Sequence, residues 1–140
     1  MPLKSHVNQP PPGAESAIIS SRTGAAASWN EMMADLQTVR VVYIGEKHTS
    51  AAHHAMQLRV IRALYALDPR MAVGMEMFDR TYQAVLDQWS AGGLEEDEFL
   101  RRTHWYANWR FDYALYRDIL QFVKSTHVRL VALNLPSNIP

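Results

Sequence analysis

The fold of this chain is decided by the stretch VRVVYIGEKH, residues 39–48. Its first six residues form a nearly continuous β-branched run, which is typical of a strand covered on both faces in a parallel sheet. Gly45 ends the run and permits a tight turn that aims Glu46 and His48 inward. We therefore expect a buried strand over residues 39–44, with a polar site where it ends.

Helices and strands alternate on both sides of this stretch. Before it, Ser28 and Glu31 have the spacing of a capping box at a helix start, and after it Thr49 or Ser50 is expected to cap a helix that ends near Leu67. The pattern further predicts a strand over 71–77, a helix over 81–89 capped by Asp79, a long helix over 109–125 and a strand over 128–133.

This alternation predicts an α/β fold with a largely parallel sheet flanked by helices. Residues 1–16 are proline-rich and read as a flexible leader, which leaves residues 17–140 as one domain. Three or four strands form a small sheet whose edge is unfinished. We therefore expect either a truncated domain or an edge that another chain covers.

Composition excludes several classes of function. Fourteen basic residues balance fourteen acidic ones, so no strong field favours nucleic acid. The chain has no cysteine, which excludes disulfides and thiolate ligation of a metal or haem. No stretch has the length and apolarity of a transmembrane helix or a signal peptide, so the chain reads as cytoplasmic as written.

Ionisable side chains follow the predicted strands. In an open parallel sheet, ligands bind outside the carboxyl ends of the strands. These ends carry Glu46 and His48, then Glu76, then Asn134, while His54 lies in the first turn of the next helix. Two carboxylates and an imidazole suit a metal ion, acid–base chemistry or a polar ligand. A plain capping or ion-pairing role for Glu76 carries about equal weight.

A second concentration is aromatic. The segment HWYANWRFDY, residues 104–113, together with Tyr116 has more aromatic rings than one helix needs for packing. These rings either fill the end of the sheet or form the wall of a flat apolar ligand. A tyrosine phenol can also ligate ferric haem, since the charge of the iron stabilises the phenolate.

An ordered set of these segments resembles the ChaN-like haem-binding uptake proteins, which are similar to the wider Tiki, TraB and erythromycin-esterase group. The resemblance covers about residues 17–136 and rests on VVYIGEKH (41–48), HHAMQ (53–57), GMEMF (74–78), Gln83, Leu86, Asp87, Trp105, Trp109, Tyr116 and ALN (132–134).

The resemblance implies a bacterial haem-binding protein of haem or iron acquisition that acts as a homodimer and is not an enzyme. It also implies a periplasmic or membrane-anchored lipoprotein. On this hypothesis Tyr116 or Tyr113 ligates the iron, and His48 or His54 contacts the iron or a propionate. The remaining residues expected to contact haem are Trp105 and Trp109 as walls, with Glu46, Glu76 and Asn134.

The alternative function is catalytic. Glu46, His48 and Glu76 would activate water in a hydrolase of the esterase or protease kind, assisted by a divalent metal ion.

Overall fold

The computed structural model describes residues 18–136 of the chain. The chain divides into two compact units, Met1–Arg40 and Val41–Pro140. The leader expected over residues 1–16 lies outside the described part. Within that part, no helix is long and apolar enough to cross a membrane.

The described residues of the first unit, 18–40, form a small hairpin and one helix. Strands β1 (Ile18–Ile19) and β2 (Ala26–Ala27) pair antiparallel, and helix α1 spans Trp29–Leu36. The Ser28 side chain accepts from the backbone N–H of Glu31, and the Glu31 carboxylate accepts from the backbone N–H of Ser28. The capping box is therefore confirmed.

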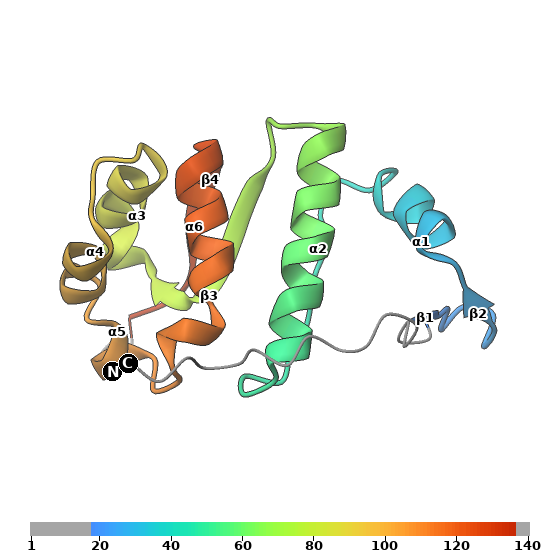
Figure 1. The fold of residues 1–140 in the computed structure, drawn as a ribbon, viewed down its shortest axis with the longest axis horizontal. Helices are drawn as coiled ribbons and strands as arrows, with labels where there is room; N and C mark the ends of the chain where they lie inside the picture. The colour runs from blue at the N-terminus through green and yellow to red at the C-terminus, as the bar shows by residue number, and fades with distance from the viewer. Residues whose placement is uncertain (1–17, 137–140) are drawn as a thin grey trace, which may run out of the picture. The chain divides into compact units, whose positions relative to one another are not determined.

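The second unit contains a parallel pair of strands, which confirms the predicted α/β class (Figure 1). Helix α2 (Ala51–Leu67) begins at Ser50, whose side chain accepts from the backbone N–H of His53. The elements after it are β3 (Ala72–Asp79), the 3₁₀ turn η1 (Arg80–Tyr82), α3 (Gln83–Ser90), α4 (Glu96–Arg102), α5 (Trp105–Asn108), the 3₁₀ turn η2 (Tyr113–Leu115), α6 (Arg117–Thr126) and β4 (Arg129–Asn134).

The strand expected over residues 39–44 was wrong as a sheet member. Residues 41–47 form no ladder with the described strands, and the side chains of Val41 and Tyr43 are 62% and 92% exposed. Ile44 is partly buried against the core, and its carbonyl accepts from the Gln57 side chain at 3.2 Å. A β-branched run favours an extended backbone, but a strand also requires a neighbour aligned for hydrogen bonding.

The helix expected over residues 109–125 is interrupted. Trp109 has an extended backbone after α5, and Asp112 starts a new turn by accepting from the backbone N–H of Ala114. The Trp105 indole also donates to the Phe111 carbonyl, which stabilises the bend. The regular helix α6 therefore begins only at Arg117, and α2 is the longest helix of the described residues.

The sheet has one covered face. Val73, Met75 and Met77 are buried, whereas the alternating residues Ala72, Gly74 and Glu76 are exposed. Strand β3 is therefore covered on one face only. Gly74 does lie at a close contact, since a Cβ there would be 2.9 Å from the Leu133 side chain.

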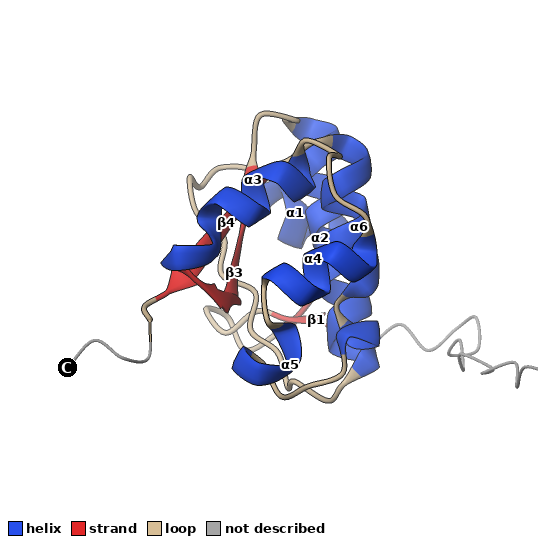
Figure 2. Ribbon diagram, turned by 90° about the vertical axis from the view of Figure 1, so that its left-hand side faces the viewer, coloured by secondary structure: helices blue, strands red, loops and turns tan. Residues whose placement is uncertain are grey.

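The core lies between this sheet and the helices. Helix α3 packs against β4 and α6. Figure 2 shows α3 lying beside the pair of strands β3 and β4. The largest fully buried side chains come from nearly every element of the unit: Phe78, Leu86, Trp89, Phe99, Trp105, Tyr116, Leu120, Val123 and Leu130.

The outer edge of β4 is hydrogen-bonded by side chains of α3. The Gln83 amide donates to the Leu130 carbonyl at 2.8 Å and accepts from the Ala132 N–H at 2.9 Å. The Ser90 hydroxyl accepts from the Leu130 N–H at 3.1 Å. Helix α3 therefore occupies the position of a neighbouring strand and protects this edge from pairing with other chains.

We expect Gln83→Met to lower the free energy of unfolding by about 1–3 kcal/mol for each buried backbone group left unpaired. Gln88→Met is the matched control, because Gln88 is exposed on the same helix and its side chain accepts from the Arg102 side chain, not from a strand. Urea unfolding followed by circular dichroism measures both variants. Equal losses in the two would contradict this role of Gln83.

Candidate functional site

A buried carboxylate lies at the centre of the candidate site. Glu46 follows Gly45 in the turn before α2, and its side chain is only 4% exposed. Its Oε1 accepts from the Tyr116 hydroxyl at 2.8 Å and lies 2.7 Å from His48 Nδ1. These contacts join the turn at residue 46 to the start of α6, 70 positions further along the chain.

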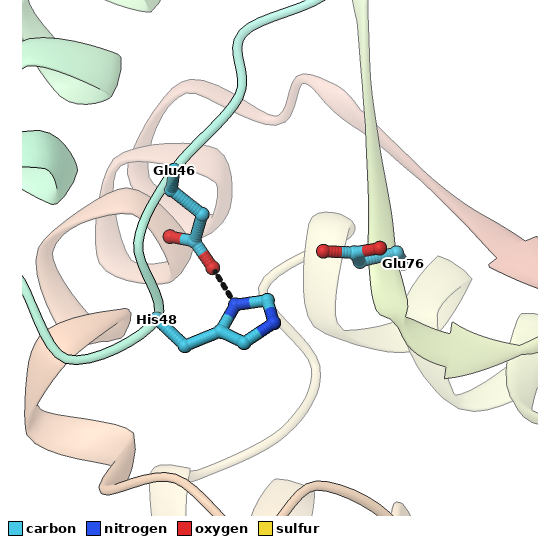
Figure 3. A group of neighbouring side chains, drawn as sticks. All are labelled: Glu46, His48 and Glu76. Atoms are coloured by element: carbon cyan, nitrogen blue, oxygen red, sulfur yellow. Dashed lines mark hydrogen bonds and ion pairs between the residues drawn. The ribbon is translucent and has the colours of Figure 1, made fainter.

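His48 connects this buried group to the surface. Its side chain is 37% exposed, and its ring lies against the rings of Trp109 and Phe111, with centroid distances of 4.9 and 4.7 Å. Because Nδ1 faces Glu46, the other ring nitrogen is directed away from the carboxylate (Figure 3).

His54 supports the same turn from the first turn of α2. Its side chain is 4% exposed, and its Nδ1 lies 2.7 Å from Glu46 Oε2, although the two are not aligned as a regular hydrogen bond. Its Nδ1 is also 3.2 Å from Gln57 Oε1, and its Nε2 is 3.1 Å from the His48 carbonyl. His54 therefore fixes both the carboxylate of Glu46 and the backbone of His48.

Glu76 completes a cluster with Glu46 and His48. It is exposed on the open face of β3, and Figure 3 shows its carboxylate directed toward the other two side chains. One ligand atom from each of the three residues lies within 4.8 Å of the others. Glu46, His48 and Glu76 therefore converge as expected, although the segment before Glu46 is not paired in the sheet.

The Tyr116 phenol faces inward. The residue is fully buried, and its ring lies 4.4 Å from that of His54. Burial and the neighbouring Glu46 carboxylate raise the pKa of the Tyr116 hydroxyl above its ordinary value. In this arrangement the hydroxyl keeps its proton and donates a hydrogen bond to Glu46.

Tyr113 belongs to a different group of side chains. Its hydroxyl donates to Glu96 at 3.3 Å, beside the hydrogen bonds that Glu96 receives from Arg117 and Gln121. Burial and the Glu96 carboxylate raise the pKa of Tyr113. This group joins α4 to η2 and α6, and it places Tyr113 outside the hydrogen bonds around Glu46. Iron ligation by Tyr113 or Tyr116 stays a prediction.

Comparison with known protein families identifies the family of this chain. The model of the family described as "Haem-binding uptake, Tiki superfamily, ChaN" matches residues 32–140. The chain belongs to this family. No curated protein sequence matches the chain. The family's description is a haem-binding one, and the match covers every residue of the cluster.

A solved structure of the ChaN family shares the fold. It is described as "Cofacial heme binding to ChaN of Campylobacter jejuni" and is 21% identical in sequence. The superposition has a TM-score of 0.74 and covers 86% of this chain but 49% of the other, so this chain spans about half the length of that relative.

The other expected residues of this ChaN-family chain lie at varied distances from the cluster. Trp109 contacts His48, as a wall residue would. Trp105 is 1% exposed and packs against Phe78 and Tyr116, so it is part of the core. The Asn134 side chain donates to the backbone carbonyl of Glu76 at 3.3 Å, so it lies beside β3.

Two residues that contact the histidines of the site were not predicted as site residues. Phe111 lies in the aromatic segment 104–113, but ring counts alone do not say which ring meets His48. Gln57 follows His54 by three positions on α2, a spacing that places both on one helix face. That spacing was the available signal for Gln57.

Proposed function

We propose that this chain binds haem, in a role of haem or iron acquisition, and that it is not an enzyme. The observation that carries the proposal is the match of residues 32–140 to a haem-binding family. The geometry supports it, because the matched residues present a partly exposed imidazole beside two aromatic rings.

The residues present fit haem by their chemistry. Imidazole is a common axial ligand of haem iron, and the His48 ring has a nitrogen that is not turned toward Glu46. Trp109 and Phe111 offer apolar surface next to it, as a flat apolar ligand requires. When bound, haem supplies an iron centre that accepts a nitrogen or oxygen ligand.

The assembly proposed with haem is a homodimer. The related ChaN of Campylobacter jejuni supports it, since that protein binds haem cofacially and cofacial binding means two haem groups face to face. Each copy would contribute one haem-contacting surface of the kind formed here by His48, Trp109 and Phe111.

A haemin titration followed by visible absorption tests the proposal. We expect a saturable shift of the Soret band with the wild-type chain. We expect binding to weaken by at least about tenfold in His48→Gln, because an oriented metal ligand and its supporting hydrogen bond typically contribute that much affinity. Sedimentation of the haem-loaded chain measures dimer formation.

Variants of the tyrosines show whether a phenol ligates the iron instead. A tyrosinate-like charge-transfer band that disappears in Tyr113→Phe or Tyr116→Phe would assign the iron to that phenol. Absence of a saturable shift, from a wild-type chain that unfolds cooperatively, would contradict haem binding by this chain.

A second candidate function is metal-assisted hydrolysis. It is favoured by the 4.8 Å cluster of Glu46, His48 and Glu76, because two carboxylates and an imidazole are ligands for zinc, manganese or cobalt. A metal ion held there would lower the pKa of its bound water and generate a nucleophile.

We expect this alternative, if it operates, to give metal-dependent cleavage of ester or peptide substrates that is lost in Glu46→Gln, His48→Gln and Glu76→Gln. Glu76→Gln is the most informative of the three, because Glu76 is exposed and its substitution disturbs no buried contact. The measurement is the rate with zinc, manganese or cobalt across a substrate screen. A rate that Glu46→Gln leaves unchanged would contradict the hydrolase.

A further inference from the structure

The cluster has an inner part and an outer part. The inner part is the Glu46 side chain, which is 4% exposed and contacts Tyr116, His48 and His54. The outer part is the His48 ring at 37% exposure and the exposed carboxylate of Glu76. A ligand that arrives from solvent therefore meets His48 and Glu76 before Glu46.

Glu46 determines which nitrogen of His48 carries the proton. The Oε1 of Glu46 accepts from the Tyr116 hydroxyl, so at 2.7 Å the Nδ1 of His48 faces an acceptor and is assigned as the donor. A neutral imidazole has one N–H, and its other nitrogen then carries a free lone pair. The contact leaves Nε2 as a base on the side of Glu76 (Figure 3).

Two buried groups hold Glu46 in place. The Tyr116 hydroxyl donates to the same Oε1 that faces His48. His54 lies against Oε2 and contacts the His48 carbonyl. The carboxylate is thus fixed from both sides, which leaves it little freedom to turn outward.

We propose that Glu46, Tyr116 and His54 are positioning residues that hold His48 as its Nδ1–H tautomer, so that Nε2 is presented with Glu76 to a cationic metal centre. The proposal rests on the proposed function, since haem iron is one such centre and a free divalent ion is the other. The carboxylate of Glu76 beside Nε2 favours a positive centre and disfavours a haem propionate at this position.

Nuclear magnetic resonance of the ¹⁵N-labelled apoprotein tests the tautomer directly. Long-range ¹H–¹⁵N correlation at mildly alkaline pH distinguishes protonated from unprotonated ring nitrogens, and His48→Gln assigns the signals. We expect the Nδ1–H form in the wild type. In Glu46→Gln we expect the Nε2–H form to gain population, because the glutamine amide can donate to Nδ1.

Two phenol deletions provide matched variants. Tyr116→Phe removes the donor to Glu46, whereas Tyr113→Phe removes the hydroxyl of another buried tyrosine, which bonds Glu96. We expect the His48 tautomer to change in Tyr116→Phe and to stay as in the wild type in Tyr113→Phe. A general loss of packing would affect both variants alike.

Titrations with haemin and, separately, with Co²⁺ identify the metal centre. Affinity for the centre that binds should fall about 10- to 100-fold in Glu46→Gln, as for other residues that orient metal-binding histidines. An Nε2–H form in the wild type, or unchanged tautomer and affinity in both Glu46→Gln and Tyr116→Phe, would overturn the proposal. The predicted tautomer in a chain that binds neither probe would instead support the positioning role and contradict the proposed function.

Discussion

The hydrogen bond between the Tyr116 hydroxyl and the Glu46 carboxylate is the contact on which the candidate site depends. It joins the turn before α2 to the start of α6. It therefore brings the ionisable residues of that turn next to the aromatic residues that precede α6. A carboxylate in an interior is costly unless its oxygens are satisfied. Here Tyr116 and His48 supply hydrogen-bonding groups, and His54 supplies a close contact to the second oxygen.

The same contact divides the candidate ligands by accessibility. The buried residues Tyr116 and His54 hold Glu46 in place, whereas His48 and Glu76 are accessible from solvent. This division explains how one cluster supports two functional hypotheses. An exposed imidazole can ligate haem iron, and the same imidazole together with a carboxylate can ligate a divalent ion. The family match favours haem, and the cluster of three donors allows a metal ion.

The local features of the fold were predictable from the sequence, because short-range chemistry determines them. The capping box at Ser28 and the helix start at Ser50 depend on neighbouring residues alone. The strand around Gly74 was predicted from its apolar run, and β4 supplies the partner that it needs. The strand predicted over residues 39–44 was wrong, since strand pairing depends on a partner that propensity does not describe. The break near Trp109 was missed because the extended backbone there and the Asp112 cap interrupt an otherwise helical apolar pattern.

The meeting of Glu46, His48 and Glu76 was predicted from the sequence, whereas the hydrogen bond from Tyr116 to Glu46 was not, because a contact between distant residues leaves no periodic signal. Resonance Raman spectroscopy of the ferrous, haem-loaded chain tests the account most directly, since the iron–imidazole stretching band responds to the hydrogen bond at Nδ1. The account predicts such a band, lost in His48→Gln and shifted in Glu46→Gln. A haem-loaded chain without the band, or with one that Glu46→Gln leaves in place, would contradict it.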